Sequence, residues 1–167
     1  MEILSSLYKE YAGREPDRIL PLTASGSRRR YYRIGCGTAP SPRTVIGVIG
    51  TDRRENMAFM ALASHFMSKG INVPEVLAAS ADGMCYLQED LGDRSLFDAV
   101  SRGRESGNYS PEEKSLLLMT VATLPQIQFL GAEGLDFSVC HPEPAFGERL
   151  VMSDLNYFKY CYLKTLP

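Results

Sequence analysis

The segment Met84–Phe97 reads MCYLQEDLGDRSLF, and the interpretation of the whole chain depends on it. Its first residues predict a short strand, which runs into the acidic pair Glu89-Asp90 and a Leu-Gly turn. A helix is expected to begin at Asp93 or Ser95. Taken alone, this is a plain strand-to-helix loop with Asp93 as N-cap. The same pattern also suits a connector between two lobes, whose peptide groups would face a flat heterocycle such as adenine.

The bulk composition of the chain is that of one ordinary globular domain. It has 167 residues, 44% of them hydrophobic and 23% charged, with a net charge of −2. This balance provides no positive field for nucleic acid or for an anionic membrane. The apolar runs are too short to cross a bilayer, so we expect neither nucleic acid nor a membrane as partner.

The cysteines and histidines form no recognisable metal or disulfide pattern. The four cysteines are scattered without a C-x-x-C pair, and the N-terminal segment lacks the features of a secretory signal. We therefore expect reduced thiols and a cytoplasmic location. His65 and His141 have no Cys, Asp or Glu at ligand spacing, so no metal site is predicted.

Hydrophobic periodicity predicts a mixed α+β arrangement before the connector and helices after it. A helix is expected over Met1–Tyr11 and another over Asp52–Lys69. Ser110-Pro111-Glu112-Glu113 is a capping box that opens a helix to about Leu130, with a kink at Pro125. Ser153 or Asp154 is expected to cap a last helix rich in aromatic residues. Five strands are predicted, at residues 18–22, 30–34, 44–49, 76–79 and 85–88.

Four segments in this order resemble the N-terminal part of the aminoglycoside phosphotransferase-like kinases, which phosphorylate small-molecule hydroxyls. LTASGSRRRYYRI (22–34) looks like the nucleotide-covering hairpin, and TVIGVI (44–49) stands where the third strand would be. ENMAFMALASHFMSKGINVPEVLAAS (55–80) resembles helix C with the following strand, and YLQEDLGDRSLF (86–97) resembles the hinge. The bacterial sugar-kinase branch is the most similar.

The resemblance implies a protein-kinase-like fold and a division of the chain. Residues 1–88 would be the small lobe, a five-stranded antiparallel sheet with helix C, and residues 89–93 would be the hinge. Residues 94–167 would be the first helices of a helical lobe that stops before the catalytic loop. On this interpretation the chain is the nucleotide-binding portion of an ATP-dependent phosphotransferase and is not active alone.

The resemblance also implies site residues. The small residues Ser25, Gly26 and Ser27 would let backbone N–H groups approach phosphates, and Arg29 and Arg30 would add charge-assisted contacts. A second group completes the nucleotide site. Glu55 would match the helix-C glutamate that pairs with a strand lysine, and the backbone of Glu89 and Leu91 would match the hinge positions that bind adenine. For the arginines and Glu55, a solvated hairpin tip and a first-turn helix residue remain the alternatives.

The sequence departs from the family in two places. The third strand carries no lysine, and Gly47 stands near its expected position, so an arginine of RRRYYR is a candidate substitute. No catalytic Asp with an Asn five residues later is present: Asp154-Leu155-Asn156 imitates a fragment, but Lys159 occupies the Asn position. No catalytic or metal-binding residue is therefore assigned.

Three further expectations follow from the resemblance. ATP is the expected cofactor, with Mg²⁺ in the full-length enzyme, and a sugar or amino-sugar hydroxyl is the expected acceptor. The aromatic last helix would be left exposed without a catalytic half, which predicts self-association. The alternative is a non-catalytic binding or adaptor module with a kinase-like small lobe, which the missing lysine favours.

Overall fold

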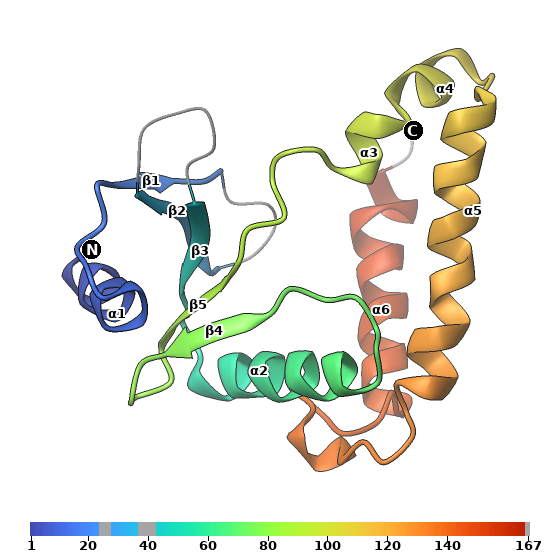
Figure 1. Cartoon of the computed structure of the whole chain (residues 1–167). Helices are drawn as coiled ribbons and strands as arrows, with labels where there is room; N and C mark the ends of the chain where they lie inside the picture. Colours follow the sequence, from blue (N-terminus) through green and yellow to red (C-terminus); the bar gives the residue numbers. More distant parts are fainter. Residues whose placement is uncertain (24–27, 37–42, 166–167) are drawn as a thin grey trace. The chain divides into compact units, whose positions relative to one another are not determined.

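Five strands form one antiparallel sheet in the order β1-β2-β3-β5-β4, which confirms the predicted α+β class and the five-stranded sheet (Figure 1). The computed structural model describes residues 1–23, 28–36 and 43–165. The strands are β1 (Arg18–Pro21), β2 (Arg30–Cys36), β3 (Arg43–Ile49), β4 (Val76–Ala79) and β5 (Cys85–Glu89). In the register, Arg30 lies opposite Ile49, and Ile49 lies opposite Cys85.

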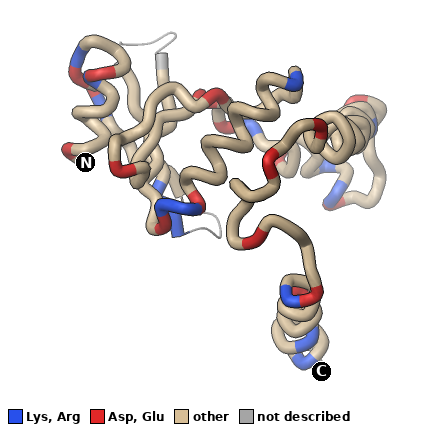
Figure 2. Tube along the Cα trace, turned by 90° about the horizontal axis from the view of Figure 1, so that it is seen from below, with Lys and Arg blue, Asp and Glu red and all other residues tan. Residues whose placement is uncertain are grey.

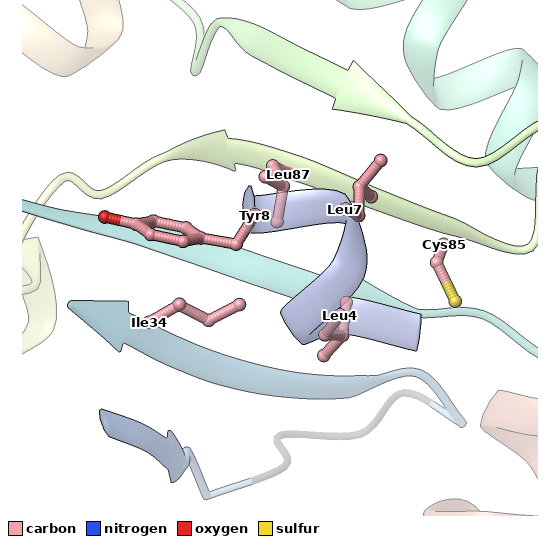
Figure 3. Packing of buried hydrophobic residues seen from close by; sticks show 6 residues of the cluster. All are labelled: Leu4, Leu7, Tyr8, Ile34, Cys85 and Leu87. Atoms are coloured by element: carbon pink, nitrogen blue, oxygen red, sulfur yellow. The ribbon is translucent and has the colours of Figure 1, made fainter. Parts of the chain in front are cut away.

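Helix α1 (Glu2–Ala12) covers one face of this sheet. Its apolar positions recur at helical spacing, and each buried aliphatic side chain contributes about 1.5–3 kcal/mol. Figure 3 shows how side chains from α1, β2 and β5 meet in one cluster. The buried members of this cluster are Leu4, Leu7, Tyr8, Ile34, Cys85 and Leu87.

Helix α2 (Arg53–Ser68) covers the opposite face. There Ile46, Val48 and Tyr86 are buried, and Phe59 and Met60 of α2 pack against them. The alternation of side chains along each strand explains the division, because successive residues point to opposite faces. The sheet therefore has an α1 face, covered by α1, and an α2 face, covered by α2.

Helix α2 is fixed to the sheet at its first turns. The Asp52 carboxylate caps it by accepting hydrogen bonds from the backbone N–H groups of Arg54 and Glu55. One turn later, the fully buried Asn56 donates its amide N–H groups to the carbonyl oxygens of Gly83 and Met84, at 3.0 and 3.1 Å. The helix start is thus held against the turn before β5.

The chain after β5 is helical, as the capping box predicted. The helices are α3 (Leu96–Ala99), α4 (Ser101–Ser106), α5 (Pro111–Pro125) and the π-helix η1 (Gln126–Leu130). Ser95 caps α3, and Ser110 and Glu113 cap α5 reciprocally. Pro125 is the last residue of α5, and the π-helical turn η1 follows it directly.

The chain divides into two compact units, Met1–Leu135 and Asp136–Pro167. The second unit contains η2 (Phe137–Val139), α6 (Glu148–Cys161) and η3 (Leu163–Thr165). The prediction that Ser153 or Asp154 caps the last helix is wrong, because α6 begins at Glu148 with Gly147 as N-cap. Good helix formers precede both predicted caps, so the helix starts a turn and a half earlier.

Candidate functional site

Arg29 and Glu55 form an ion pair between the start of β2 and the first turn of α2. The Nη2 atom of Arg29 lies 3.1 Å from Oε1 of Glu55 and donates a hydrogen bond of 3.1 Å to the Glu55 carbonyl oxygen. Arg29 is 10% exposed and Glu55 is 43% exposed, so the pair has one buried and one solvated partner. The structure thus brings together two of the predicted site residues.

The Arg29 side chain packs on the ring of Phe59, which in turn packs on Tyr86. The guanidinium carbon lies 5.4 Å from the centroid of the Phe59 ring, which is one helical turn after Glu55. The Phe59 ring stacks on Tyr86 of β5, with centroids 5.2 Å apart. Burial raises the pKa of the Tyr86 phenol, so this group stays neutral at physiological pH. The sequence showed Phe59 only as a core position, because the spacing gave no sign of its contact with Arg29.

Arg30 lies on the other face of the sheet. Its cross-strand partner is Ile49, which packs on the α1 face, and so does Tyr32, two residues further along β2. Arg29, the residue before β2, contacts Glu55 and Phe59 of α2, so the two adjacent arginines lie on opposite faces of the sheet. The structure does not bring Arg30 together with Glu55.

The position of Gly47 shows that a cation at this point of β3 would not face α2. A Cβ atom at Gly47 would lie 2.6 Å from Cδ1 of Ile34 and 3.2 Å from Leu4, both in the α1-face cluster. The β3 residues that face α2 are Ile46 and Val48, and both are apolar. A lysine at position 47 would therefore point away from Glu55.

The connector after β5 is bound to the sheet by Arg33 of β2. The Arg33 guanidinium donates to both carboxylate oxygens of Asp90, at 2.6 and 3.0 Å, and to Asp93 at 2.6 Å. Arg33 is on the α2 face by alternation, because Tyr32 and Ile34 both pack on the α1 face. These contacts raise the pKa of Arg33, so it remains a cation throughout the physiological range.

The predicted hinge residues Glu89 and Leu91 flank this contact. The Glu89 N–H donates to the carbonyl oxygen of Glu75 at 2.9 Å, which removes that N–H from the set of ligand donors. Leu91 is 68% exposed. A cavity opens beside the connector, with walls from β1, β2, β3 and the connector itself. Its lining residues are Arg18, Arg33, Thr44, Asp90, Gly92 and Asp93.

Two cations therefore follow one another on the α2 face: Arg29 directly before β2, beside α2, and Arg33 at the centre of β2, bound to the connector. Tyr31 lies between them and packs against the buried residues Ile46, Val48 and Tyr86. At about 3.3 Å per residue, the two arginines are roughly 13 Å apart along the strand. The sequence analysis included Arg33 only as a member of RRRYYR and did not predict its contact with Asp90. The alternation of Arg33 with Tyr31 and Arg29 was a usable signal for its face.

Ser25, Gly26 and Ser27 lie outside the described residues. Within residues 1–23, 28–36 and 43–165, no group of three or more His, Cys, Asp or Glu side chains is placed to hold a metal ion. Positive and negative positions are interspersed along the chain in Figure 2, in keeping with the net charge of −2.

Comparison with known proteins adds no family. The chain matches no protein-family model. It also matches none of the curated proteins. Among the described residues, no helix is long and apolar enough to cross a membrane.

Proposed function

We propose that this chain is the nucleotide-binding portion of an ATP-dependent phosphotransferase of the aminoglycoside phosphotransferase-like type. The acceptor is a small-molecule hydroxyl, on a sugar or an amino sugar. The observation that carries the proposal is the ion pair between Arg29 and Glu55. The resemblance expects a lysine of the sheet to pair with a glutamate of this helix. In this chain Arg29 takes the place of the lysine, and Glu55 is the carboxylate partner.

Electrostatics favour the Arg29 end of the α2 face for phosphate groups. An arginine forms charge-assisted, bidentate hydrogen bonds to phosphate oxygens, and Glu55 and Phe59 already fix the direction of its side chain. Phosphoryl transfer depends mainly on positioning and charge neutralisation, so a pre-oriented cation is the contribution expected from this lobe. In the full-length enzyme, Mg²⁺ would neutralise further phosphate charge.

The connector end is the proposed location of the base. The carbonyl oxygen of Glu89 and the peptide groups of Leu91 would bind the heterocycle, and Tyr31 and Ile46 supply apolar surface between base and phosphates. The five-stranded sheet with α2 on this face and a connector passing into helices is the arrangement that a kinase-like small lobe requires. The unpaired thiols among the described cysteines accord with a cytoplasmic location.

A titration with Mg²⁺ and ATP, followed by the backbone amide signals in NMR, tests the proposal. We expect weak binding, in the millimolar range, that Arg29→Met abolishes, because methionine keeps an unbranched apolar stem but has no guanidinium and no charge. Arg30→Met is the matched control, since its side chain lies on the α1 face. If the variants Arg29→Ala and Arg30→Ala both bind ATP as the wild-type chain does, these arginines do not bind the phosphates.

A second candidate is a non-catalytic binding or adaptor module with a kinase-like small lobe. It is favoured by the apolar residues Ile46 and Val48 on the α2 face of β3, the strand on which the resemblance expects a lysine. The same titration separates the two candidates. Absence of amide shifts at millimolar ATP favours the adaptor, and micromolar affinity contradicts the expectation that this chain supplies only one side of the cleft.

A further inference from the structure

The Asp90 carboxylate is the point at which the connector joins the sheet. It accepts two hydrogen bonds from Arg33 of β2, one from the Thr44 side chain of β3 and one of 2.9 Å from the backbone N–H of Gly92. Only 5% of the Asp90 side chain is exposed. The first residues after β5 are therefore fixed to the sheet by side chains of β2 and β3.

The second carboxylate of the connector contributes much less. Asp93 accepts a single hydrogen bond from Arg33, and its side chain is 83% exposed. Exposed ion pairs are screened by water and salt and add little order, whereas a buried, bidentate arginine-carboxylate pair has one defined geometry. Arg33 thus holds the connector mainly through Asp90.

We propose that Arg33 is a positioning residue that fixes the peptide groups of Leu91 for the base of the bound nucleotide. The proposal rests on the proposed function, because it concerns the same site. Leu91 is flanked by Asp90 and Gly92, and both are held by the same carboxylate. The positive φ of Gly92, +84°, completes a turn whose conformation the hydrogen bonds to Asp90 preserve.

The physical benefit is preorganisation. A mobile connector would lose conformational entropy when its peptide groups bind a base, and this loss would reduce affinity. A connector that Arg33 already orders avoids the loss. A lysine at position 33 would keep the charge but would not reproduce the two-atom fork on Asp90, so it should order the connector incompletely.

Amide hydrogen exchange tests the ordering itself and needs no ligand. In Arg33→Met and Arg33→Lys we expect the Gly92 amide to exchange at least about tenfold faster than in the wild-type chain, which corresponds to about 1.4 kcal/mol of lost local stability. Asp90→Asn is a second variant should Arg33→Met fail to fold. Asp93→Asn is the matched control and should leave Gly92 exchange nearly unchanged. Unchanged Gly92 exchange in the folded Arg33 and Asp90 variants would overturn the proposal.

A comparison of ATP with tripolyphosphate, both with Mg²⁺, tests the link to the base. We expect Arg33→Lys to weaken ATP binding severalfold while tripolyphosphate, which has no base, binds as before. A parallel fall for both ligands would show general damage and would overturn the positioning role. If the wild-type protein binds neither ligand, the proposed function is overturned, and with it the role of Arg33 in positioning Leu91 for the base. The exchange experiment would then still decide whether Arg33 orders the connector.

Discussion

Arg29 and Glu55 are 26 residues apart in the sequence, yet the Arg29 guanidinium contacts both the carboxylate and the carbonyl oxygen of Glu55 at 3.1 Å. The contact ties the start of β2 to the first turn of α2, so it joins the sheet to the helix at the candidate phosphate end. Removing the cation leaves Glu55 in contact with water, whereas removing the carboxylate leaves a buried arginine with fewer acceptors.

Arg29→Met should lower the free energy of unfolding by about 1–2 kcal/mol, because it removes a half-buried ion pair together with the guanidinium contact on the Phe59 ring, while the aliphatic part of the side chain stays. Urea unfolding followed by far-UV circular dichroism measures this. The matched control is Lys9→Met, which removes a solvent-exposed ion pair to Glu15 and should cost much less than the loss of the Arg29 pair. Equal losses for the two variants would contradict a special role for the Arg29 pair.

Stability should depend on the protonation of Asp90 in acid. Burial acts to raise the pKa of this carboxyl, but the hydrogen bonds from Arg33, Thr44 and the Gly92 N–H outweigh it and hold the pKa below its ordinary value. A lowered folded-state pKa means that the stabilisation is present above about pH 4 and is lost as the pH falls through the lowered value.

The measurement for Asp90 is urea unfolding from neutral pH down to about pH 2, in wild-type protein and in Asp90→Asn. At neutral pH the variant should be less stable by about 1.5–3 kcal/mol, the usual contribution of a hydrogen-bonded charged group. Below about pH 4 the difference should shrink as Asp90 itself becomes neutral. A difference that stays constant over the whole pH range would refute this role of the Asp90 charge.

Gly50→Ala should destabilise the sheet-to-helix junction by about 2–4 kcal/mol, because overpacking here also breaks buried hydrogen bonds. A Cβ atom at Gly50 would lie 2.2 Å from Nδ2 of Asn56, the atom that donates to the carbonyl oxygens of Gly83 and Met84. The double variant Gly50→Ala/Asn56→Ala provides the check by thermal unfolding. Its loss should be smaller than the sum of the two single losses, since the clash needs Asn56; additive losses would argue against the clash.

Gly47→Lys should not restore a strand lysine. The new side chain would enter the α1 face beside Leu4 and Ile34, so we expect a loss of about 1–3 kcal/mol and no gain in ATP affinity. Urea unfolding and the NMR titration measure the two effects. Tighter ATP binding by this variant would mean that position 47 faces the nucleotide.

The apolar stripe of α6 should drive self-association. Val151, Leu155, Phe158 and Tyr162 recur at helical spacing, all of them are exposed, and the Phe158 and Tyr162 rings stack at 5.3 Å. Sedimentation velocity should show a concentration-dependent oligomer that Leu155→Glu weakens at least about tenfold, the cost of placing a charge in an apolar contact. Tyr157→Glu, on the other side of the helix, is the control. A monomer at all concentrations would refute the prediction.

The secondary structure was largely readable because it depends on local patterns. Val76–Ala79 is predicted and observed with the same bounds, and the Ser110–Glu113 capping box marks the start of α5. The start of α6 was misplaced because Ser153 and Asp154 are good caps by residue type, while Gly147 carries no side-chain signal for a cap. Helix ends depend on small free-energy differences that residue type alone does not resolve.

The candidate site was only partly readable, for a geometric reason. The arginine run and Glu55 were recognisable, but which arginine would meet Glu55 depended on the phase of β2 in the sheet. A shift of one residue would have exchanged Arg29 and Arg30 between the two faces. The role of Arg33 could likewise not be predicted, because it depends on Asp90, which is 57 residues away in the sequence, lying beside Arg33 in the folded chain.

The sequence by itself determined the elements, because hydrophobic periodicity and capping chemistry are properties of neighbouring residues. From MCYLQEDLGDRSLF it also determined that a short acidic connector separates a strand from helices. Only the tertiary structure decided that Arg33 binds Asp90 and that Arg29, rather than Arg30, pairs with Glu55. Such pairings depend on strand register and on which face a helix covers, and both are fixed by packing between distant segments.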